Sequence, residues 1–271
     1  EMLVQGKWRR HRPGWPLAVV GIIVIAALLL PLILPFDYRG IDWNHVRSAP
    51  GEGGHWFGTD DLGRDRLARL AVGTRVTLGV ALAAATVSLI IGTIWGAVAG
   101  WVGGRVDEFM MRVVDALYAL PFMFVVILLM VVFGRSILLV FVGIGAVEWL
   151  TMARVVRGQV MHWKQRPFVL ASEAAGAPSR LRLIRHVMPN VAGVALAYLL
   201  LTVPQVVMVE SFLSFLGLGV QEPLTSLGIL VNEGAQDMDI APMGLILPGA
   251  VLVALVACLT IAGERLRDRL S

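Results

Sequence analysis

Residues 76–100 read VTLGVALAAATVSLIIGTIWGAVAG, a run without a single Asp, Glu, Lys or Arg. An α-helix rises about 1.5 Å per residue, so about 20 apolar residues suffice to cross a hydrocarbon core of roughly 30 Å. The run is long enough to do so. It therefore predicts one membrane-spanning helix, and the rest of the chain decides whether it is one of several.

The composition extends this prediction to the whole chain of 271 residues. Hydrophobic residues make up 57% and charged residues only 15%, whereas soluble domains are about 45–50% apolar and about 25% charged. We therefore expect an all-α integral membrane protein, with one transmembrane domain over 17–271 after an N-terminal segment 1–16. The six predicted spans cover 17–36, 76–100, 110–133, 137–156, 191–215 and 244–263.

The first predicted span follows a basic segment, as the apolar part of a signal peptide does. Its length is sufficient to cross a bilayer, and Pro31, Pro35 and Asp37 stand where a small-residue cleavage site would be sought. We expect it to be retained as a span.

Charge between the spans predicts the orientation. Lys and Arg are concentrated in 1–16, in 157–190 and after residue 263, whereas 216–242 has four acidic residues and no Lys or Arg. Short basic loops are retained on the cytoplasmic side. Both termini, 101–109 and 157–190 are thus expected inside, with 37–75, 134–136 and 216–242 outside.

The same charge pattern bears on other function classes. The net charge of +4 is explained by these basic loops, so no nucleic-acid partner is expected. The single cysteine, Cys258, allows no disulfide or CxxC pair. The five histidines (11, 45, 55, 162 and 186) form no HExxH motif and no close cluster in the sequence, so no metal site is expected.

The basic loop 157–190 has the pattern of two short helices joined by a sharp turn. Pro167 suits the first turn of a helix, Gly176 can adopt the left-handed conformation that ends one, Pro178 can begin a second, and Pro189 is expected to end it. In the second helix, an apolar stripe is expected opposite Arg182, Arg185 and His186. The stripe consists of Leu181, Ile184, Val187 and Met188.

Three roles are open for this loop. A basic amphipathic segment can rest on anionic lipid headgroups. A catalytic role is disfavoured, because Glu173 has no paired acid, nucleophile or metal nearby in the sequence. A docking surface is favoured by the run Ala174-Ala175-Gly176, since small residues let another backbone approach closely.

The loop sequence ASEAAGAPSRLRLIRHVMPN at 171–190 resembles the EAA loop of permease subunits of binding-protein-dependent ABC importers. Four further segments resemble the dipeptide/oligopeptide/nickel branch, and PFMFVVILL (121–129) with FLSFLGLGVQEPLTSLG (212–228) is most similar to the C-type subunit of oligopeptide permeases. Leu227 and Met243 depart from the tryptophans expected in that group, and Glu264 from an aspartate. The four segments are HWFGTDDLGRDRLARL (55–70), GWVGGRVDEFMMRVVDAL (100–117), ARVVRGQV (153–160) and ESFLSFLGLGVQEP (210–223).

The resemblance implies a type I ABC importer permease-like bundle that forms half of a pore for oligopeptides in the bacterial cytoplasmic membrane. It implies a homologous second permease subunit, two ABC ATPase subunits and an extracytoplasmic peptide-binding protein as partners, and no enzymatic activity in this chain. The residues it assigns to ATPase coupling are Glu173, Ala174, Ala175, Gly176, Ile184 and Pro189. Glu173 would pair with a basic residue of the ATPase.

No cofactor is expected on this chain. A Walker A loop needs Lys followed by Ser or Thr, but Lys7 is followed by Trp8 and Lys164 by Gln165. ATP and Mg²⁺ are therefore expected on the partner ATPase subunits.

Three acidic residues fall within predicted spans. Asp115, Glu148 and Glu210 could relay protons, or they could pair with neighbouring helices, as Asp115 could with Arg112. Pairing is preferred for Asp115 and Glu148, whereas Glu210 is a candidate for the translocation path.

The segment 55–70 carries a further set of candidate residues. It could be a solvated surface helix with i,i+4 charge pairs or a docking surface for the binding protein. Its candidate docking residues are Asp60, Asp61, Arg64 and Asp65.

Several alternative functions remain open. One is a permease for dipeptides, nickel or other small solutes. Another is a proton-coupled secondary transporter, which predicts an inverted repeat that the two halves do not display. An intramembrane hydrolase would need a nucleophile and a base in the spans, and there is no GxSxG or HExxH motif.

Overall fold

The computed structural model describes residues 14–133 and 137–270, and the regular elements among these residues are all helices, joined by loops, with no β-strand. The predicted segment 1–16, up to residue 13, and the predicted turn 134–136 lie outside the described residues. The all-α prediction is confirmed. The elements are α1 (Trp15–Ile33), η2 (Glu52–Gly54), α2 (Arg66–Val102), α3 (Gly104–Tyr118), α4 (Phe122–Phe133), α5 (Ile137–Lys164), α6 (Pro167–Ala174), α7 (Ser179–Arg182), η3 (Leu183–Val187), α8 (Met188–Phe215), α9 (Leu227–Gln236) and α10 (Met243–Leu270).

Four helices of the described chain are long and apolar enough to cross a membrane. They are α1, α2, the continuous helix Ser179–Phe215 that contains α8, and Met243–Asp268 of α10. These four correspond to the first, second, fifth and sixth predicted spans. The predicted fourth span, 137–156, lies within α5, which has 28 residues.

The third predicted span, 110–133, is not one continuous helix, so that prediction is wrong in detail. α3 ends at Tyr118 and α4 begins at Phe122, with Pro121 between them. Proline has no N–H and its ring clashes with the carbonyl four residues earlier, so it breaks a helix. With 12 residues, α4 is about 18 Å long, which is less than a hydrocarbon core of roughly 30 Å.

α2 begins ten residues before its predicted boundary at residue 76, because a side chain caps it. Asp65 has an extended backbone, and its carboxylate accepts a hydrogen bond from the backbone N–H of Ala68 (2.7 Å). Aspartate is among the best N-cap residues. The arginines in the first turns of α2 lower the hydropathy there, so the hydropathy pattern did not reveal that the helix begins at residue 66. Their side chains nevertheless make contacts within the fold.

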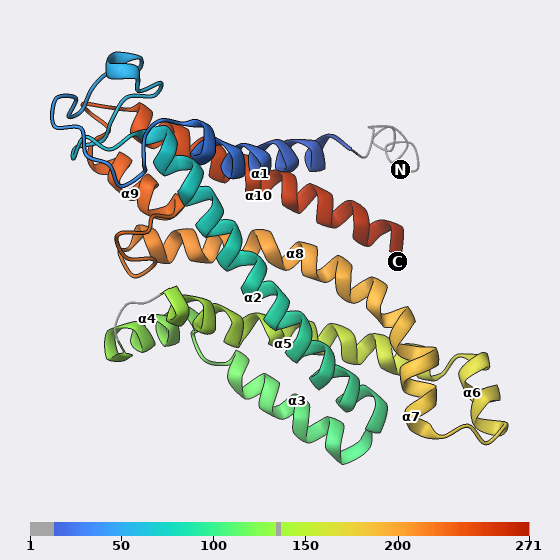
Figure 1. Ribbon diagram of the computed structural model, residues 1–271. Coiled ribbons are helices and arrows are strands. Elements are labelled where there is room, and N and C mark those ends of the chain that lie inside the picture. The colour runs from blue at the N-terminus through green and yellow to red at the C-terminus, as the bar shows by residue number, and fades with distance from the viewer. Residues whose placement is uncertain (1–13, 134–136, 271) are drawn as a thin grey trace, which may run out of the picture.

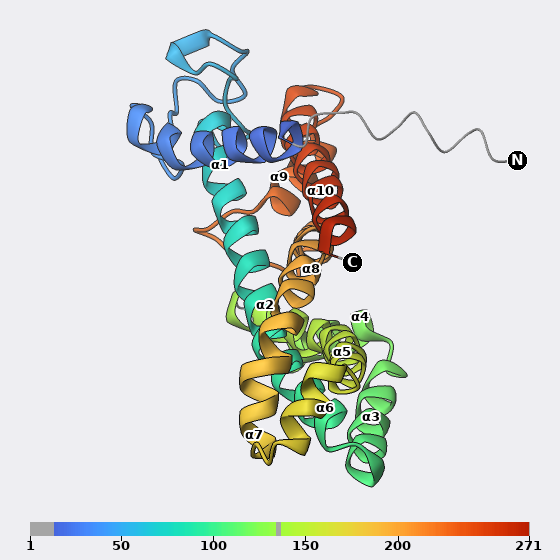
Figure 2. The same cartoon turned by 90° about the vertical axis from the view of Figure 1, so that its right-hand side faces the viewer.

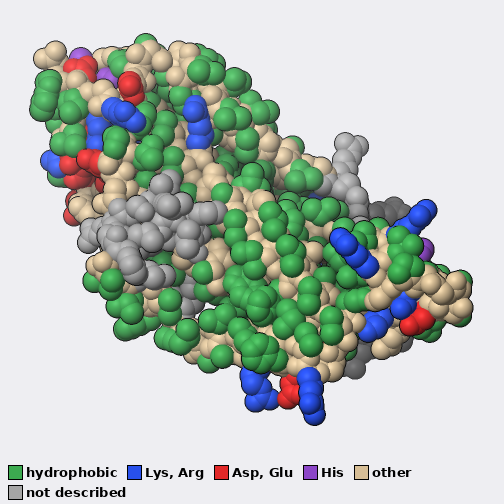
Figure 3. All heavy atoms as spheres, turned by 60° about the horizontal axis from the view of Figure 1, so that its bottom comes forward, with side chains coloured by type: hydrophobic (Ala, Val, Ile, Leu, Met, Phe, Trp, Pro, Cys, Tyr) green, Lys and Arg blue, Asp and Glu red, His purple; other side chains and the backbone are tan. Residues whose placement is uncertain are grey.

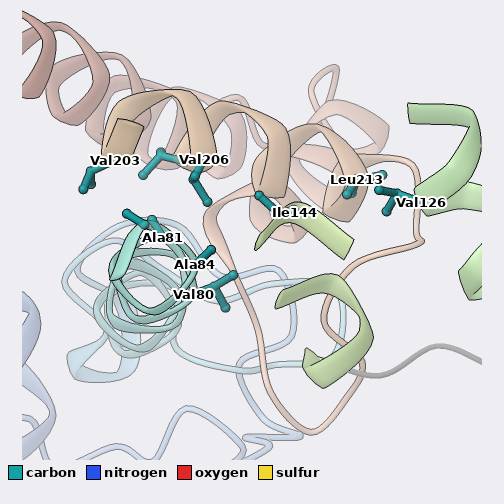
Figure 4. Close-up of a cluster of buried hydrophobic side chains, with 10 residues drawn as sticks. Val80, Ala81, Ala84, Val126, Ile144, Val203, Val206 and Leu213 are labelled. Carbon is teal, nitrogen blue, oxygen red and sulfur yellow. The ribbon is translucent and has the colours of Figure 1, made fainter. Parts of the chain in front are cut away.

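α2 and α8 run through the middle of the molecule and join its two sides. α1, α9 and α10 lie on one side of them and α3 to α7 on the other (Figure 2). The core between α2, α5 and α8 contains Ala81, Ala84, Ile144, Val203 and Val206, which lie close together in Figure 4. The branched side chains of α5 and α8 thus pack against small residues of α2.

The contact between α2 and α5 depends on three glycines spaced four residues apart. A Cβ atom at Gly92 would lie 2.6 Å from the Cβ of Met152, and one at Gly100 would lie 2.7 Å from the carbonyl oxygen of Arg157. At Gly96 it would overlap the carbonyl oxygen of Ala153. Small residues at this spacing let membrane helices approach at backbone distance.

The two ends of the bundle are formed by different elements. α6 and α7 lie at one end, and the loop 37–65 with α9 lies at the other (Figure 1). The first residues of α1 and the last of α10 point toward the end that carries α6 and α7 (Figure 1). A broad apolar surface covers the middle of the face in Figure 3, with most charged side chains toward the ends and along one edge.

Candidate functional site

The central loop, residues 157–190, forms the predicted pair of short helices joined by a turn. α6 begins with Pro167 in its first turn and ends at Ala174. Gly176 follows with φ of +79°, in the left-handed region that a glycine adopts without strain. The backbone N–H of Ala177 then donates to the carbonyl of Ser172 (3.1 Å) and closes the turn.

Pro189 does not end the second helix, so that prediction is wrong. α7 passes through the π-helical turn η3 directly into α8, and Pro189 lies in the first turn of α8. In the π turn the N–H of Met188 donates to Leu183, five residues earlier. In a π turn the backbone N–H bonds to the carbonyl five residues earlier instead of four. This change in the hydrogen bonds lets the helix accommodate Pro189, which has no N–H. The loop is thereby rigidly continuous with a span.

Glu173 pairs within the loop. Its carboxylate lies 2.6 Å from the guanidinium of Arg182, whose side chain is only 13% exposed. Arg182 also lies over the ring of Trp101, 5.7 Å from its centroid. Arg182 was expected on the side opposite the apolar stripe, and it is this side chain, and not the stripe residue Ile184, that faces inward and joins α6 to α7.

Trp101, at the end of α2, anchors the loop to two further helices. Its indole N–H donates to the hydroxyl of Ser179 (2.8 Å), and its carbonyl accepts from the ammonium of Lys164 at the end of α5 (2.6 Å). Val169 and Val187 are fully buried. They belong to a cluster with residues of α2, α5 and α8. A force on the loop would therefore reach three long helices at once.

The other face of the loop presents apolar and small side chains. Leu170 and Ile184 are 51% and 55% exposed, and Ala174 and Ala175 are also exposed. The loop thus has the small residues and the apolar surface that a protein partner could cover. Ile184 and Pro189 of the predicted coupling set are both exposed as well.

At the opposite end, residues 37–69 and 216–242 form what we call the charged cap. Arg69 of α2 is the centre of its ion pairs: its guanidinium donates to Asp60 (2.5 Å) and, through two nitrogens, to Glu233 of α9 (2.6 and 2.9 Å). Arg64 pairs with Asp60 (2.7 Å) and with Glu222 (2.8 Å). The two predicted outer segments are therefore joined to each other.

The cap places the four predicted docking residues differently. Residues 55–65 form a looped segment and not the surface helix that was considered. Asp60 and Asp65 are buried (8% and 2% exposed) and the Arg64 side chain is 12% exposed, which leaves Asp61 as the exposed member. Burial lowers the pKa of Arg64, but its hydrogen bonds to Glu222 and Asp60 outweigh this, so the pKa is raised overall.

Glu210 is fully buried. Its carboxylate accepts hydrogen bonds from the hydroxyls of Ser214 (2.7 Å) and Ser211 (3.4 Å), both on α8. Glu210 therefore reaches no surface of this chain in this conformation. Its role in the translocation path stays a prediction.

The other two acidic residues of the predicted spans, Asp115 and Glu148, have different surroundings. Asp115 pairs with Arg154 of α5 (2.7 Å) and not with Arg112, which pairs with Glu108 (3.2 Å). Pairing between helices was the preferred role, so only the partner was wrong. Glu148 is half-buried on α5.

Sequence reasoning missed one group of polar side chains. His45 and His55 lie together in the charged cap, with ring centroids 6.0 Å apart, and Asp42 contacts both. The expectation that the histidines form no close cluster is wrong, because a loop brings residues ten positions apart into contact.

Comparison with known proteins gives consistent matches. Residues 92–271 match the family described as binding-protein-dependent transport system inner membrane component. The chain is 46% identical to the oligopeptide transport system permease protein OppC of Haemophilus influenzae over 255 residues, which is 94% of this chain and 82% of the relative. It is 47% identical to OppC of Escherichia coli K12 (94% and 84%). It is 40% identical to the dipeptide transport system permease protein DppC of Bacillus subtilis over 235 residues (85% and 73%).

Proposed function

Because the chain belongs to the family of inner membrane components of binding-protein-dependent transport systems, we propose that it forms half of the pore of an ATP-driven importer of oligopeptides. It is a multi-pass inner-membrane protein and a transport subunit. The observation that carries the proposal is the match to oligopeptide permeases over 94% of the chain. The dipeptide permease DppC of Bacillus subtilis is 40% identical, as is the OppC of the same organism, so dipeptides are the second candidate substrate.

The partners follow from the transport system. A permease of this type works with an ATPase and a binding protein. We infer a homologous second permease subunit, two ATPase subunits that bind ATP and Mg²⁺, and an extracytoplasmic peptide-binding protein. We also infer six spans with both termini in the cytoplasm, with the third span interrupted at Pro121.

The central loop is the proposed contact with the ATPase. Its exposed face, with Ala174, Ala175 and Ile184, would lie in a groove of that subunit. The pair Glu173–Arg182 keeps α6 and α7 in one orientation, and Trp101 joins them to α2 and α5. Movement of the ATPase would then tilt these helices as a unit and open the pore to either side in turn.

Co-purification tests this proposal directly. The chain, extracted from its native membrane in mild detergent, is expected to bring with it a second permease and Walker-containing ATPase chains, identified by mass spectrometry. Recovery of this chain alone in a form that transports peptide would contradict the proposal and favour a secondary transporter.

Charge reversal at Glu173 is expected to impair transport without unfolding the chain. Glu173 is 57% exposed, and its partner Arg182 keeps its contact with the Trp101 ring. Loss of a pair with one exposed member should cost about 1 kcal/mol, so the amount of the Glu173→Arg variant in the membrane should be close to that of the wild type. Peptide uptake should fall about tenfold or more if coupling energy of roughly 1.4 kcal/mol is lost, while ATP hydrolysis continues. Uptake and ATPase assays in proteoliposomes measure both.

Two further variants show what Glu173 contacts. Exchange of both charges (Glu173→Arg with Arg182→Glu) should restore uptake if the lock between α6 and α7 is what matters. If it does not, Glu173 acts on the ATPase directly. The control is Glu108→Arg, which breaks the exposed pair with Arg112 on α3 and should leave uptake unchanged. Normal, coupled uptake by Glu173→Arg itself would contradict the coupling role.

A further inference from the structure

Three side chains of the charged cap have the composition and spacing of a metal site. One ligand atom from each of Asp42, His45 and His55 lies within 4.8 Å of the other two. The Asp42 carboxylate oxygen Oδ2 is 2.8 Å from Nδ1 of His45 and 3.6 Å from Nε2 of His55. Ligand atoms about 2.0 Å from a tetrahedral zinc ion are about 3.3 Å apart, so these atoms would have to shift to reach binding distance. The proton that His45 Nδ1 donates to Asp42 would be released to water when the ion binds.

The orientation of His55 supplies an independent observation. Its side chain is 2% exposed, and its Nδ1 lies 2.8 Å from the carboxylate of Asp65, which is also buried. A carboxylate only accepts, so Nδ1 carries a proton, and in the neutral imidazole Nε2 then has a free lone pair. Nε2 is buried and has no hydrogen-bond partner among the described residues. It points toward Asp42, 3.6 Å away. A histidine held by a carboxylate through its other nitrogen is the usual arrangement at a metal ion.

The surrounding loop fixes the other two ligands. One oxygen of Asp42 accepts from the backbone N–H of Asn44 (3.0 Å), which leaves Oδ2 for the histidines. Gly53 has φ of +58°, and a Cβ atom there would lie 2.7 Å from the ring of His45. Phe36 stacks on the ring of His55 at 4.0 Å between centroids. The imidazole rings therefore have defined places, and a side chain at position 53 would displace one of them.

We propose that Asp42, His45 and His55 bind one divalent transition-metal ion of the zinc class, with Asp65 orienting His55. Two imidazoles and a carboxylate favour Zn²⁺ and its neighbours over Ca²⁺ or Mg²⁺, which prefer oxygen ligands alone. The side chains of Asp42 and His45 are about one-third exposed (32% and 36%), so water can supply a fourth ligand. Asp65 also caps α2, and the ion would therefore fasten the loop 37–58 to the start of a span.

Zinc binding by the full chain in mild detergent tests the proposal without reference to transport. After treatment with a chelator, dialysis against Zn²⁺ and desalting, the wild type should retain about one zinc ion per chain more than His55→Asn, as expected for loss of a ligand. His45→Asn should weaken binding at least tenfold. Asp65→Asn should weaken it by about 10- to 100-fold, the usual effect of losing an outer hydrogen bond. Substitution by Co²⁺ should give visible absorption bands in the wild type and not in His55→Asn.

The controls separate binding from folding. His162→Asn removes an exposed histidine of α5 and should bind zinc as the wild type does. His45 is partly exposed, so His45→Asn should elute and melt like the metal-free wild type, while zinc should raise the melting temperature of the wild type and of His162→Asn but not that of His45→Asn. The proposal is overturned if the wild type retains no more zinc than His45→Asn and His55→Asn, or if His162→Asn loses as much. In that outcome His55 is only a packed side chain between Asp42 and Asp65.

Discussion

Substitution of Gly96 by alanine is expected to lower the melting temperature of the folded chain strongly. A Cβ atom at this position would overlap the carbonyl oxygen of Ala153 and lie 2.9 Å from the backbone nitrogen of Arg157. Both are backbone atoms of α5 and cannot turn away as a flexible side chain could. The two helices would have to separate along their contact, which costs about 3 kcal/mol or more.

The matched control is Gly79→Ala on the same helix, where a new Cβ atom would have no other atom within 4 Å. Alanine stabilises a helix by about 1 kcal/mol relative to glycine, so Gly79→Ala should be as stable as the wild type or slightly more. Size-exclusion chromatography of both variants in detergent, after heating to a series of temperatures, gives the comparison. Equal melting temperatures would show that α2 and α5 do not pack as described.

The local conformation of the central loop follows closely from its sequence. Pro167 in a first helical turn and Gly176 in a left-handed turn are both found, because each residue has few conformations that suit it. Arg182 was misplaced, since a helical pattern shows which side chains share a face but not which face is buried. Trp101, which helps to bury Arg182, is far away in the sequence.

The interrupted third span shows the limit of hydropathy. Pro121 lies within an apolar run of the sequence. Membrane helices tolerate proline when neighbours satisfy the freed backbone groups, and α8 and α10 continue through Pro204 and Pro248. The sequence does not show which prolines will bend a helix and which will divide it. The choice depends on the packing of α3 and α4 against α5.

The charged cap could not be predicted, because its contacts are distant in sequence. Arg69 and Glu233 are separated by 164 positions, and no spacing rule connects them. The i,i+4 pattern of 55–70 suggested a helix, but Asp65 begins a helix and does not lie within one. The proximity of His45 and His55 likewise could not be predicted, because it depends on the conformation of the loop between them.

Replacement of Arg69 by methionine is expected to destabilise the cap more than any change at its surface. The Arg69 side chain is 4% exposed and lies between Asp60 and Glu233. Without it, Asp60 and Glu233 keep only Arg64 as a shared cation, which lies 2.7 Å from Asp60 but 3.8 Å from Glu233. Removal of one member of a fully buried ion pair costs about 3–5 kcal/mol. Because Glu233 is 33% exposed and Arg64 remains, the loss here should lie near or below the lower end of that range. The melting temperature in detergent should fall accordingly, and protease should cut the loop 37–65 more readily.

Three comparisons decide whether the buried charge is the cause. Arg112→Met, which breaks an exposed pair with side chains 77% and 69% exposed, should cost about 1 kcal/mol or less. Arg69→Lys keeps the charge but cannot hold both carboxylates with a planar fork, so it should recover only part of the stability. Addition of Glu233→Gln to Arg69→Met should also recover part, since it removes one uncompensated carboxylate. If Arg69→Met melts like Arg112→Met, water reaches the site freely and the cap is not held together by this arginine. A large loss that Glu233→Gln partly reverses would establish that opposite charges join the loop before α2 to α9, and hence that the two outer segments move together.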